Sequence, residues 1–279
     1  MQQKLERLYR ILFRPKQVLI HSHVSDLEIG KIYQADLPIH AGPNQTAIAL
    51  CDHQDSGKLS NWSTWRSAAR KGFEDSLNAP SQPSPVDMVE VTNYLRANLP
   101  EDAIITNGAG NFATWANKFI KFTKSMRLLA PQSGAMGYGV PASIAAKISD
   151  PDGMVLCFAG DGDFQMNCQE LGSAMQAGAA PVILILNNGT YGTIRMHQER
   201  TYPERVSGTQ LMNPDFVALA KSYGFHSEKV ETTEDFVPAF ERAIASSTGA
   251  VLELMISAEA LTPRQTLSDM RAIAKKNQS

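Results

Sequence analysis

The sequence predicts an α/β protein with a parallel sheet, and two observations support this. Short apolar segments at 103–106, 154–158 and 182–186 have the length and composition of buried strands, and segments with helical periodicity alternate with them. Such alternation is typical of parallel strands joined by crossover helices. Glycines and polar side chains follow these apolar segments, so a ligand site is expected at the carboxyl ends of the strands.

The beginning of the chain predicts a remnant of another α/β unit. Residues 1–16 combine basic and apolar side chains in the manner of a short amphipathic helix. A strand at 17–20, a helix that starts at Ser25 and Asp26, and a strand at 37–39 would together form a strand-helix-strand remnant.

A helix and a proline-rich segment separate this remnant from the remaining chain. The helix is expected at 62–73, where Trp62 and Trp65, like the later Trp115, are candidates for packing anchors. Three prolines within residues 78–85 indicate a linker or a long surface loop. Beyond them we expect helices at 86–98, 167–177, 215–223 and 234–246 and a strand at 251–255.

Composition limits the possible partners. The 279 residues are 43% hydrophobic, and 26 basic against 28 acidic side chains give a formal charge of −2. This balance argues against nucleic acid or an anionic membrane surface as a partner and favours small ligands. No apolar run approaches the roughly 20 residues of a membrane-spanning helix. Three cysteines cannot all pair, which favours a reducing compartment, so we expect a cytoplasmic protein.

The most informative stretch is an apolar strand that ends in Gly160, Asp161, Gly162 and Asp163. Glycines at such a position let the backbone turn sharply and approach a ligand closely. A helix expected from Asn167 would direct its unpaired amide groups into the same crevice, where an anion such as a diphosphate could bind. Taken alone, the motif could also be an ordinary turn.

Asn187 and Asn188 end the next apolar strand. Between Gly162 and Asn187 lie 24 residues, enough for one crossover helix and a returning strand, so the two loops are expected to be neighbours. The Asp161 carboxylate, an asparagine amide oxygen and a backbone carbonyl would supply the hard oxygen ligands that suit Mg²⁺. Diphosphate oxygens would then fill other positions around the ion.

The passage from Gly160 to Gly192 resembles the signature of thiamine-diphosphate-dependent enzymes of the acetolactate synthase, 2-oxo-acid decarboxylase and 2-hydroxyacyl-CoA lyase superfamily. The resemblance implies the three-layer, doubly wound parallel sheet of the thiamine diphosphate-binding fold, with thiamine diphosphate and Mg²⁺ as cofactors. It implies that Asp161, the side-chain oxygen of Asn188 and the carbonyl of Thr190 bind the metal. The residues that it places at the cofactor are Gly160, Gly162, Asp163, Tyr191 and Gly192.

Residues 131–142 also resemble a family segment, the one whose bulky apolar side chain holds the cofactor in a bent shape. Met136, 25 positions before Asp161, matches that side chain. By itself, Met136 could equally be a gap-filling core residue.

Residues 108–112 correspond to the family loop that closes over the diphosphate, with Asn111 and the Phe112 amide as candidate contacts. His197 follows the metal loop closely enough to be an acid/base candidate toward a substrate. Within residues 187–192 the sequence is most similar to benzoylformate-decarboxylase-like enzymes. The tryptophan and acidic residues that acetolactate synthases carry after the asparagine pair are missing from 190–199.

The resemblance also predicts the domain organisation. Residues 1–50 correspond to the end of the family's central domain, 51–85 to a connecting helix and proline-rich linker, and 86–279 to the domain that binds thiamine diphosphate and Mg²⁺. We find no counterpart of the family's pyrimidine-binding domain, which supplies a glutamate that activates the cofactor. The chain alone is therefore expected to be inactive.

The function implied by the resemblance is that of the C-terminal part of an acetolactate synthase-like enzyme that decarboxylates or joins 2-oxo acids. Its partners would be the small substrate and either further copies in a homo-oligomer or another chain that carries the pyrimidine-binding domain. The sequence leaves open whether the chain is a fragment, the subunit of a split gene or a remnant. It also leaves open two other functions, a non-catalytic Mg-thiamine diphosphate-binding or scaffold module and a 2-hydroxyacyl-CoA lyase-like subunit.

Overall fold

The structure is a computed structural model that describes residues 18–53 and 62–278. The expected helix at 1–16 lies outside the described residues. The chain divides into two compact units, Met1–Arg66 and Ser67–Ser279, which are described separately below. No helix in the described ranges is both long and apolar enough to cross a membrane.

The first unit contains a two-stranded parallel sheet and one helix. Strand β1 (Ile20–His23) pairs with β2 (Leu37–His40), and α2 (Pro43–Asp52) follows. None of the described residues of this unit is buried. A two-stranded sheet without a buried face is marginally stable at best on its own.

The helix expected between these two strands is wrong, because the segment forms turns instead. The amides of Glu28 and Ile29 bond to carbonyls only three residues back, those of Ser25 and Asp26. Gly30 then takes the left-handed conformation, with φ of 77°, which ends the turns after a few residues. The turns therefore end at Gly30, before a helix long enough to cover the sheet can form.

Helix α3 (Ser63–Ser76) extends from the first unit into the second and has no buried residue. Trp62 is 69% exposed and Trp65 is 73% exposed, so the expectation that they anchor packing is wrong in this structure. Trp115, by contrast, is only 3% exposed and packs in the core of the second unit.

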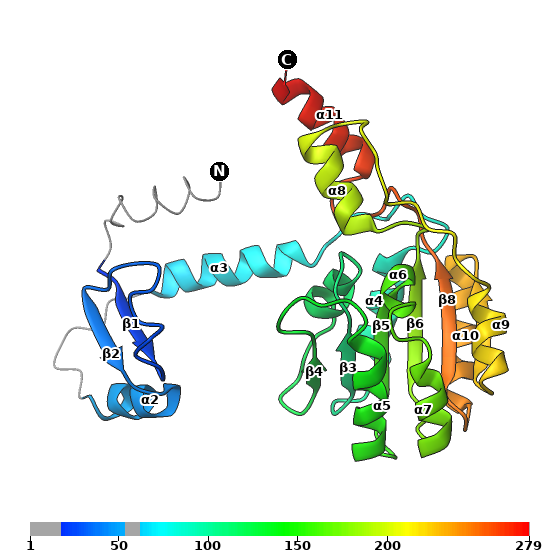
Figure 1. The fold of residues 1–279 in the computed structure, drawn as a ribbon, viewed down its shortest axis with the longest axis horizontal. Helices are drawn as coiled ribbons and strands as arrows, with labels where there is room; N and C mark the ends of the chain where they lie inside the picture. The colour runs from blue at the N-terminus through cyan, green and yellow to red at the C-terminus, as the bar shows by residue number, and fades with distance from the viewer. Residues whose placement is uncertain (1–17, 54–61, 279) are drawn as a thin grey trace. The chain divides into compact units, whose positions relative to one another are not determined.

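The second unit is built on a six-stranded sheet with the order β4-β3-β5-β6-β8-β7, in which all neighbouring strands are parallel (Figure 1). The strands are β3 (Ile104–Asn107), β4 (Arg127–Leu129), β5 (Val155–Gly160), β6 (Val182–Asn187), β7 (His226–Val230) and β8 (Ala250–Met255). The predicted parallel α/β sheet is confirmed. The two strands absent from the prediction, β4 and β7, are the edges of the sheet.

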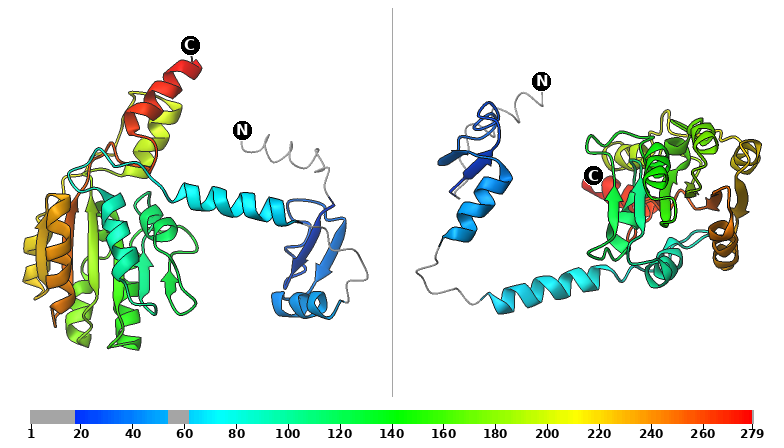
Figure 2. Two further views of the ribbon diagram at one scale, coloured as in Figure 1. Left: turned by 180° about the vertical axis from the view of Figure 1, so that it is seen from behind. Right: turned by 90° about the horizontal axis from the view of Figure 1, so that it is seen from below.

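Helices cover both faces of this sheet, which makes three layers (Figure 2). One face carries α5 (Gly139–Ser149), α7 (Glu170–Ala177) and α9 (Phe216–Ser222), and the other carries α4 (Met88–Asn98), α10 (Thr233–Ala245) and the π-helix η1 (Trp115–Phe119).

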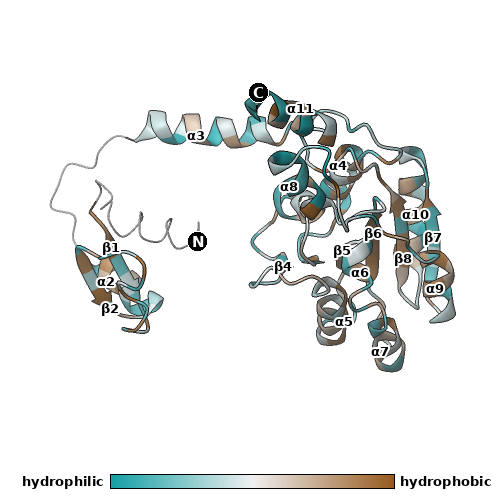
Figure 3. Ribbon diagram, turned by 45° about the horizontal axis from the view of Figure 1, so that its top comes forward, coloured by the Kyte–Doolittle hydropathy of each residue, from teal (hydrophilic) through white to brown (hydrophobic). Residues whose placement is uncertain are grey.

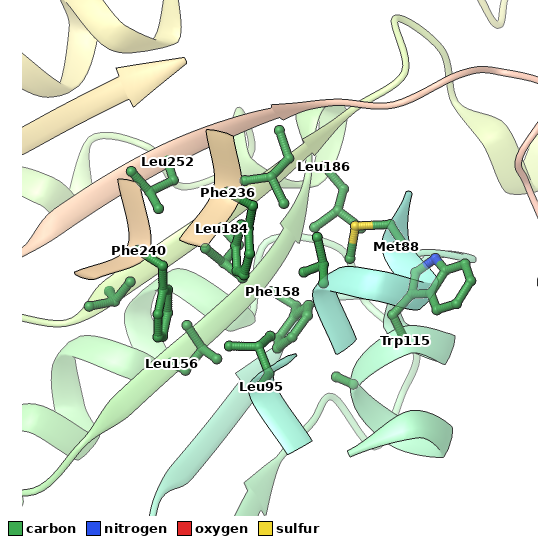
Figure 4. Packing of buried hydrophobic residues seen from close by; sticks show 14 of the residues in the cluster. Met88, Leu95, Trp115, Leu156, Phe158, Leu184, Leu186, Phe236, Phe240 and Leu252 are labelled. Carbon is green, nitrogen blue, oxygen red and sulfur yellow. The ribbon is translucent and has the colours of Figure 1, made fainter. Parts of the chain in front are cut away.

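Successive residues of the central strands alternate between two hydrophobic cores. On β5, Leu156 and Phe158 belong to the core beneath α4 and α10, whereas Cys157 and Ala159 belong to the core beneath α5 and α7. Figure 4 shows Leu156 and Phe158 among the buried side chains of the first core. In Figure 3, β6 and β8 are coloured as hydrophobic, as expected for strands covered on both faces.

The proline-rich segment 78–85 forms neither a helix nor a strand, but it is attached to the second unit. Gln82 is 8% exposed, and its side chain donates hydrogen bonds to the carbonyls of Pro80 (2.9 Å) and Pro263 (3.1 Å). The amide of Val86 donates to the carbonyl of Met255 over 3.1 Å.

Two helices pack against each other beyond the carboxyl ends of the strands: α8 (Gly192–Thr201) and α11 (Leu267–Gln278) (Figure 1). A small apolar cluster holds them together, with Met196 from α8 and Leu267 and Met270 from α11. Helix α8 begins where the loop after β6 ends, so this pair of helices borders the site described next.

Candidate functional site

A pocket lies where the loops after β3, β5 and β6 meet. These strands are neighbours in the sheet, and their carboxyl ends are close in register, with Asn107 beside Phe158 and Gly160 beside Leu186. The pocket contains every expected site residue except His197. Those residues are Asn111, Phe112, Met136, Gly160, Asp161, Gly162, Asp163, Asn188, Thr190, Tyr191 and Gly192.

His197 lies elsewhere. It is exposed on α8 and does not line the pocket. Met196, one residue earlier and about 100° away around the helix, is buried, and its sulfur lies 3.4 Å from Asn111 Nδ2. The α8 residues that line the pocket, Gly192, Thr193 and Ile194, belong to its first turn, and His197 lies one turn further along the helix.

Asp161 begins a helical turn directly after β5, because the structure has a short helix α6 (Asp161–Phe164) there. The helix expected at 167–177 is confirmed as α7, but it starts three residues later than expected, at Glu170. The early turn follows from packing: Phe164 is fully buried, and its ring lies edge-on to Phe216 with 5.5 Å between centroids.

The loop after β6 reverses sharply at Gly189, which has φ of 66°, a conformation that favours glycine. Its amide donates to Asp161 Oδ2 over 2.9 Å and to Asn187 Oδ1 over 3.1 Å. The amide of Thr190 donates to Asn188 Oδ1 over 3.0 Å. These bonds order the loop and attach it at Gly189 to the Asp161 carboxylate, and Asn188 and Thr190 line the same pocket as Asp161.

Asp163 joins two other loops of the pocket. Its Oδ1 accepts hydrogen bonds from the amides of Ala109 (3.1 Å) and Gly137 (2.9 Å). Its Oδ2 is buried without a hydrogen-bond partner. Burial raises the pKa of Asp163 to about 6, although the two backbone amides favour its ionised form. The loop after β3 and the loop of Met136 are thus both fixed by this carboxylate.

The donor set of the pocket fits a hard divalent cation. Asp161 is 3% exposed, and burial raises its pKa above the usual range. Among the described residues, no salt bridge includes Asp161 or Asp163. Two buried carboxylates without a cationic partner are costly, and a bound cation would offset that cost. In the described ranges no three His, Cys, Asp or Glu side chains gather as metal ligands, so amide and carbonyl oxygens would complete such a site.

Part of the pocket lining is apolar. Half-buried Met136 lines the pocket, and so do Leu186, Ile256 and Leu261. Oxygen-rich and apolar lining residues in one pocket suit a ligand that has an anionic group and a ring system.

Sequence reasoning missed Thr193 and Asn213, which hold the pocket loops in place. Thr193 Oγ1 accepts a hydrogen bond from the Asn111 amide (2.9 Å) and donates one to Asn111 Oδ1 (3.0 Å). Asn213 Nδ2 donates to Asp161 Oδ2 over 2.7 Å. These contacts join residues 82 and 52 positions apart, and no local pattern in the sequence marks them.

Comparison with known proteins gives one family. The domain described as "Thiamine pyrophosphate enzyme, C-terminal TPP binding domain" matches residues 108–254, the region that holds the pocket. Among similar proteins, the acetolactate synthase large subunit of Corynebacterium glutamicum is 33% identical over 245 residues, which cover 83% of this chain and 38% of that protein.

Two further relatives have similar names. The probable acetolactate synthase large subunit of Methanocaldococcus jannaschii is 32% identical over 261 residues, covering 89% of this chain and 44% of that protein. The acetolactate synthase isozyme 2 large subunit of Escherichia coli is 29% identical over 242 residues, covering 86% and 43%. The chain thus spans about two fifths of the length of these relatives. All three carry the name acetolactate synthase.

Proposed function

Since this chain belongs to the thiamine pyrophosphate enzymes and carries their C-terminal TPP-binding domain, we propose that its pocket holds thiamine diphosphate together with Mg²⁺. The family assignment confirms the expected cofactor. The proposed protein ligands of the cation are the Asp161 carboxylate, the amide oxygen of Asn188 and the backbone carbonyl of Thr190. Oxygen ligands of this kind suit Mg²⁺, which leaves further positions to diphosphate oxygens.

The remaining residues have proposed roles in binding and orientation. Gly160 and Gly162 would let the backbone approach the diphosphate, and Tyr191 and Gly192 would border it from the start of α8. The pocket wall at Met136 would hold the cofactor in the bent shape that its chemistry needs. When bound, thiamine diphosphate supplies an electron sink next to a carbonyl carbon.

The loop of Asn111 and the Phe112 amide would close over the diphosphate. Asp163 would act through this loop, because it bonds to the amides of Ala109 and Gly137 on both sides of the pocket. In this role it orients backbone groups and does not itself react.

One observation carries the proposal. The buried carboxylates Asp161 and Asp163 both follow β5 and have no salt-bridge partner in the described ranges, and Asn188, which follows the neighbouring strand β6, lines the same pocket. A divalent cation between protein and diphosphate would neutralise charge that the protein alone leaves uncompensated.

For the whole protein we propose an enzyme of the cytoplasm that acts on 2-oxo acids, by decarboxylation or by joining two of them. Its active site would be completed in a homo-oligomer or by a partner chain, through a pyrimidine-binding domain that contributes an activating glutamate. His197 enters this proposal only as an exposed group of α8 that meets substrate in the assembled enzyme. The domain boundaries expected near residues 50 and 85 belong to the same proposal.

Titration of the chain with thiamine diphosphate and Mg²⁺, followed by turnover assays with an added pyrimidine-domain protein, tests this function. We expect weak binding and no decarboxylation by the chain alone, and both stronger binding and turnover of a 2-oxo acid in the mixture. Binding without turnover under every condition would favour a non-catalytic cofactor-binding or scaffold module. Cleavage of a 2-hydroxyacyl-CoA in place of 2-oxo acid turnover would favour the lyase-like subunit.

A further inference from the structure

We propose that Asn213 is a positioning residue for the cation site, acting through the Asp161 carboxylate. The inference rests on the proposed function, because it assumes that Asp161 binds Mg²⁺. The inference adds a new role to that function: a side chain from the loop after α8, outside both metal-binding loops, sets the orientation of the Asp161 carboxylate.

The hydrogen bonds of Asn213 use its whole side-chain amide. Its Nδ2 donates to Asp161 Oδ2 over 2.7 Å and to Asn187 Oδ1 over 2.9 Å. Its Oδ1 accepts a hydrogen bond from Gln165 Nε2 over 2.9 Å. Because Gln165 binds the oxygen end, the nitrogen end must face the two acceptors. One amide therefore connects the strand-end loops of β5 and β6 in a single orientation.

Backbone pairing holds the loop of Asn213 beside the metal loop. Thr190 and Gln210 form an antiparallel bridge. The amide of Leu211 donates to the carbonyl of Gly189 over 2.9 Å, and the amide of Tyr191 donates to the carbonyl of Thr209 over 2.8 Å. Backbone hydrogen bonds between residues 209–211 and 189–191 therefore fix the start of the loop that carries Asn213, and the Asn213 side chain extends from this loop to Asp161.

A second buried carboxylate fixes Asn187 from the opposite side. Asn187 Nδ2 donates to Glu253 Oε1 over 2.7 Å, and Glu253 is 2% exposed on β8. Lys229 Nζ lies 3.4 Å from Glu253 Oε2. Asn187 thus presents its oxygen to Asn213 and its nitrogen to Glu253, and the chain of contacts ends at Asp161 Oδ2.

This network defines what Asn213 contributes. Asp161 Oδ2 accepts hydrogen bonds from the Gly189 amide and from Asn213, which fixes the plane of the carboxylate before a cation binds. Hydrogen-bond partners that orient a metal ligand in this way change metal affinity by about 10- to 100-fold when they are removed. Asn213 should therefore set the affinity for Mg²⁺ more than the stability of the fold.

The test uses the full chain and measures the Mg²⁺ dependence of thiamine diphosphate binding by calorimetry. Asn213→Ala and Asn213→Leu remove the donor, and Leu also keeps much of the side-chain volume. Met212→Ala is the matched control, because Met212 is adjacent in the same loop and 97% exposed. We expect the Asn213 variants to need about tenfold or more Mg²⁺, excess Mg²⁺ to restore cofactor binding, and Met212→Ala to behave as wild type.

Wild-type Mg²⁺ affinity in folded Asn213 variants would overturn the inference. So would a loss that excess Mg²⁺ does not reverse, because a general structural defect has that property. If neither Asn213 variant folds, Gln165→Ala provides the test, because Gln165 is exposed and its side chain fixes the orientation of the Asn213 amide. Reduced Mg²⁺ affinity of Gln165→Ala supports the inference, and unchanged Mg²⁺ affinity overturns it. Asp161→Ala in the same series separates the two proposals. If it too retains affinity, the metal site is wrong; if it alone loses affinity, only the role of Asn213 is wrong.

Discussion

Gly108 lies so close to Asp163 that a Cβ added to the glycine would be 1.9 Å from Asp163 Oδ1. The two residues follow neighbouring strands, β3 and β5, and the same oxygen accepts the hydrogen bonds of Ala109 and Gly137. The absence of a side chain at Gly108 is therefore what allows one carboxylate to hold both loops.

Gly108→Ala should destabilise the protein by about 1 to 3 kcal/mol, because the added methyl group must displace a buried, hydrogen-bonded carboxylate. Cofactor binding should weaken too, since the loop of Asn111 would shift. Gly72→Ala is the control: Gly72 lies in α3 and its added Cβ would meet no atom within 4 Å. Thermal unfolding of both variants checks the prediction, and equal melting temperatures would contradict it.

Met136→Ala should leave diphosphate binding mostly intact and lower turnover in a reconstituted enzyme, because the side chain is proposed to shape the cofactor more than to anchor it. The check is the cofactor affinity and the turnover rate per folded molecule. If Met136 only fills space, the variant would instead unfold at a lower temperature, by an amount that corresponds to about 2 to 5 kcal/mol, and keep its activity.

Glu199→Gln should loosen the attachment of α11 to α8. The Glu199 side chain has no exposed surface and binds Arg195 and Arg271, each at 2.8 Å. Gln keeps one oxygen acceptor but removes the negative charge that both guanidinium groups pair with, at a cost of about 1 to 3 kcal/mol. Glu204→Gln is the matched control, because Glu204 pairs with Lys275 at the surface, with its side chain 60% exposed, and such pairs contribute at most about 1 kcal/mol. Similar losses in both variants would contradict the prediction.

The same carboxylate predicts a pH dependence. The hydrogen bond from Arg271 and the further donors around Glu199 lower its pKa from 4.5 to about 2 in the folded chain. Its contribution to stability should be complete above pH 4.5 and decrease as the pH falls from there toward 2, because the unfolded chain takes up the proton first. The melting-temperature difference between wild type and Glu199→Gln, measured across this range, should shrink with acid; a constant difference would argue against the ion pair.

The sheet could be predicted from sequence because its central strands are buried on both faces. The continuous apolar runs that form β5 and β6 can be identified as strands from their own residues alone. The edge strand β7 is different: its sequence, His226–Val230, buries only Ser227 and Val230, so it has too few apolar residues to stand out. Helix α5 was missed for a related reason, since Gly139 and Pro141 at its start resemble a turn more than a helix.

Within the pocket, the contacts that the sequence could predict are those between loops joined by a single crossover. Asp161 and Asn188 follow strands, and a single crossover places them together, which spacing alone can reveal. Asn213 reaches Asp161 only because its loop pairs with residues 189–191, a contact that depends on the finished fold. His197 is close in sequence to the metal loop and still lies outside the pocket, because only the first turn of α8 lines the pocket and His197 is one turn further along.

The most direct test of the whole account is the Mg²⁺ dependence of thiamine diphosphate binding to the wild-type chain and to Asp161→Ala, measured by calorimetry. We predict that wild type binds the cofactor only with Mg²⁺, that Asp161→Ala abolishes this binding, and that Asn188→Ala weakens it less, because an uncompensated diphosphate cannot rest against a buried carboxylate pair. Unchanged affinity in both variants would contradict the assignment of the pocket as the cation and cofactor site.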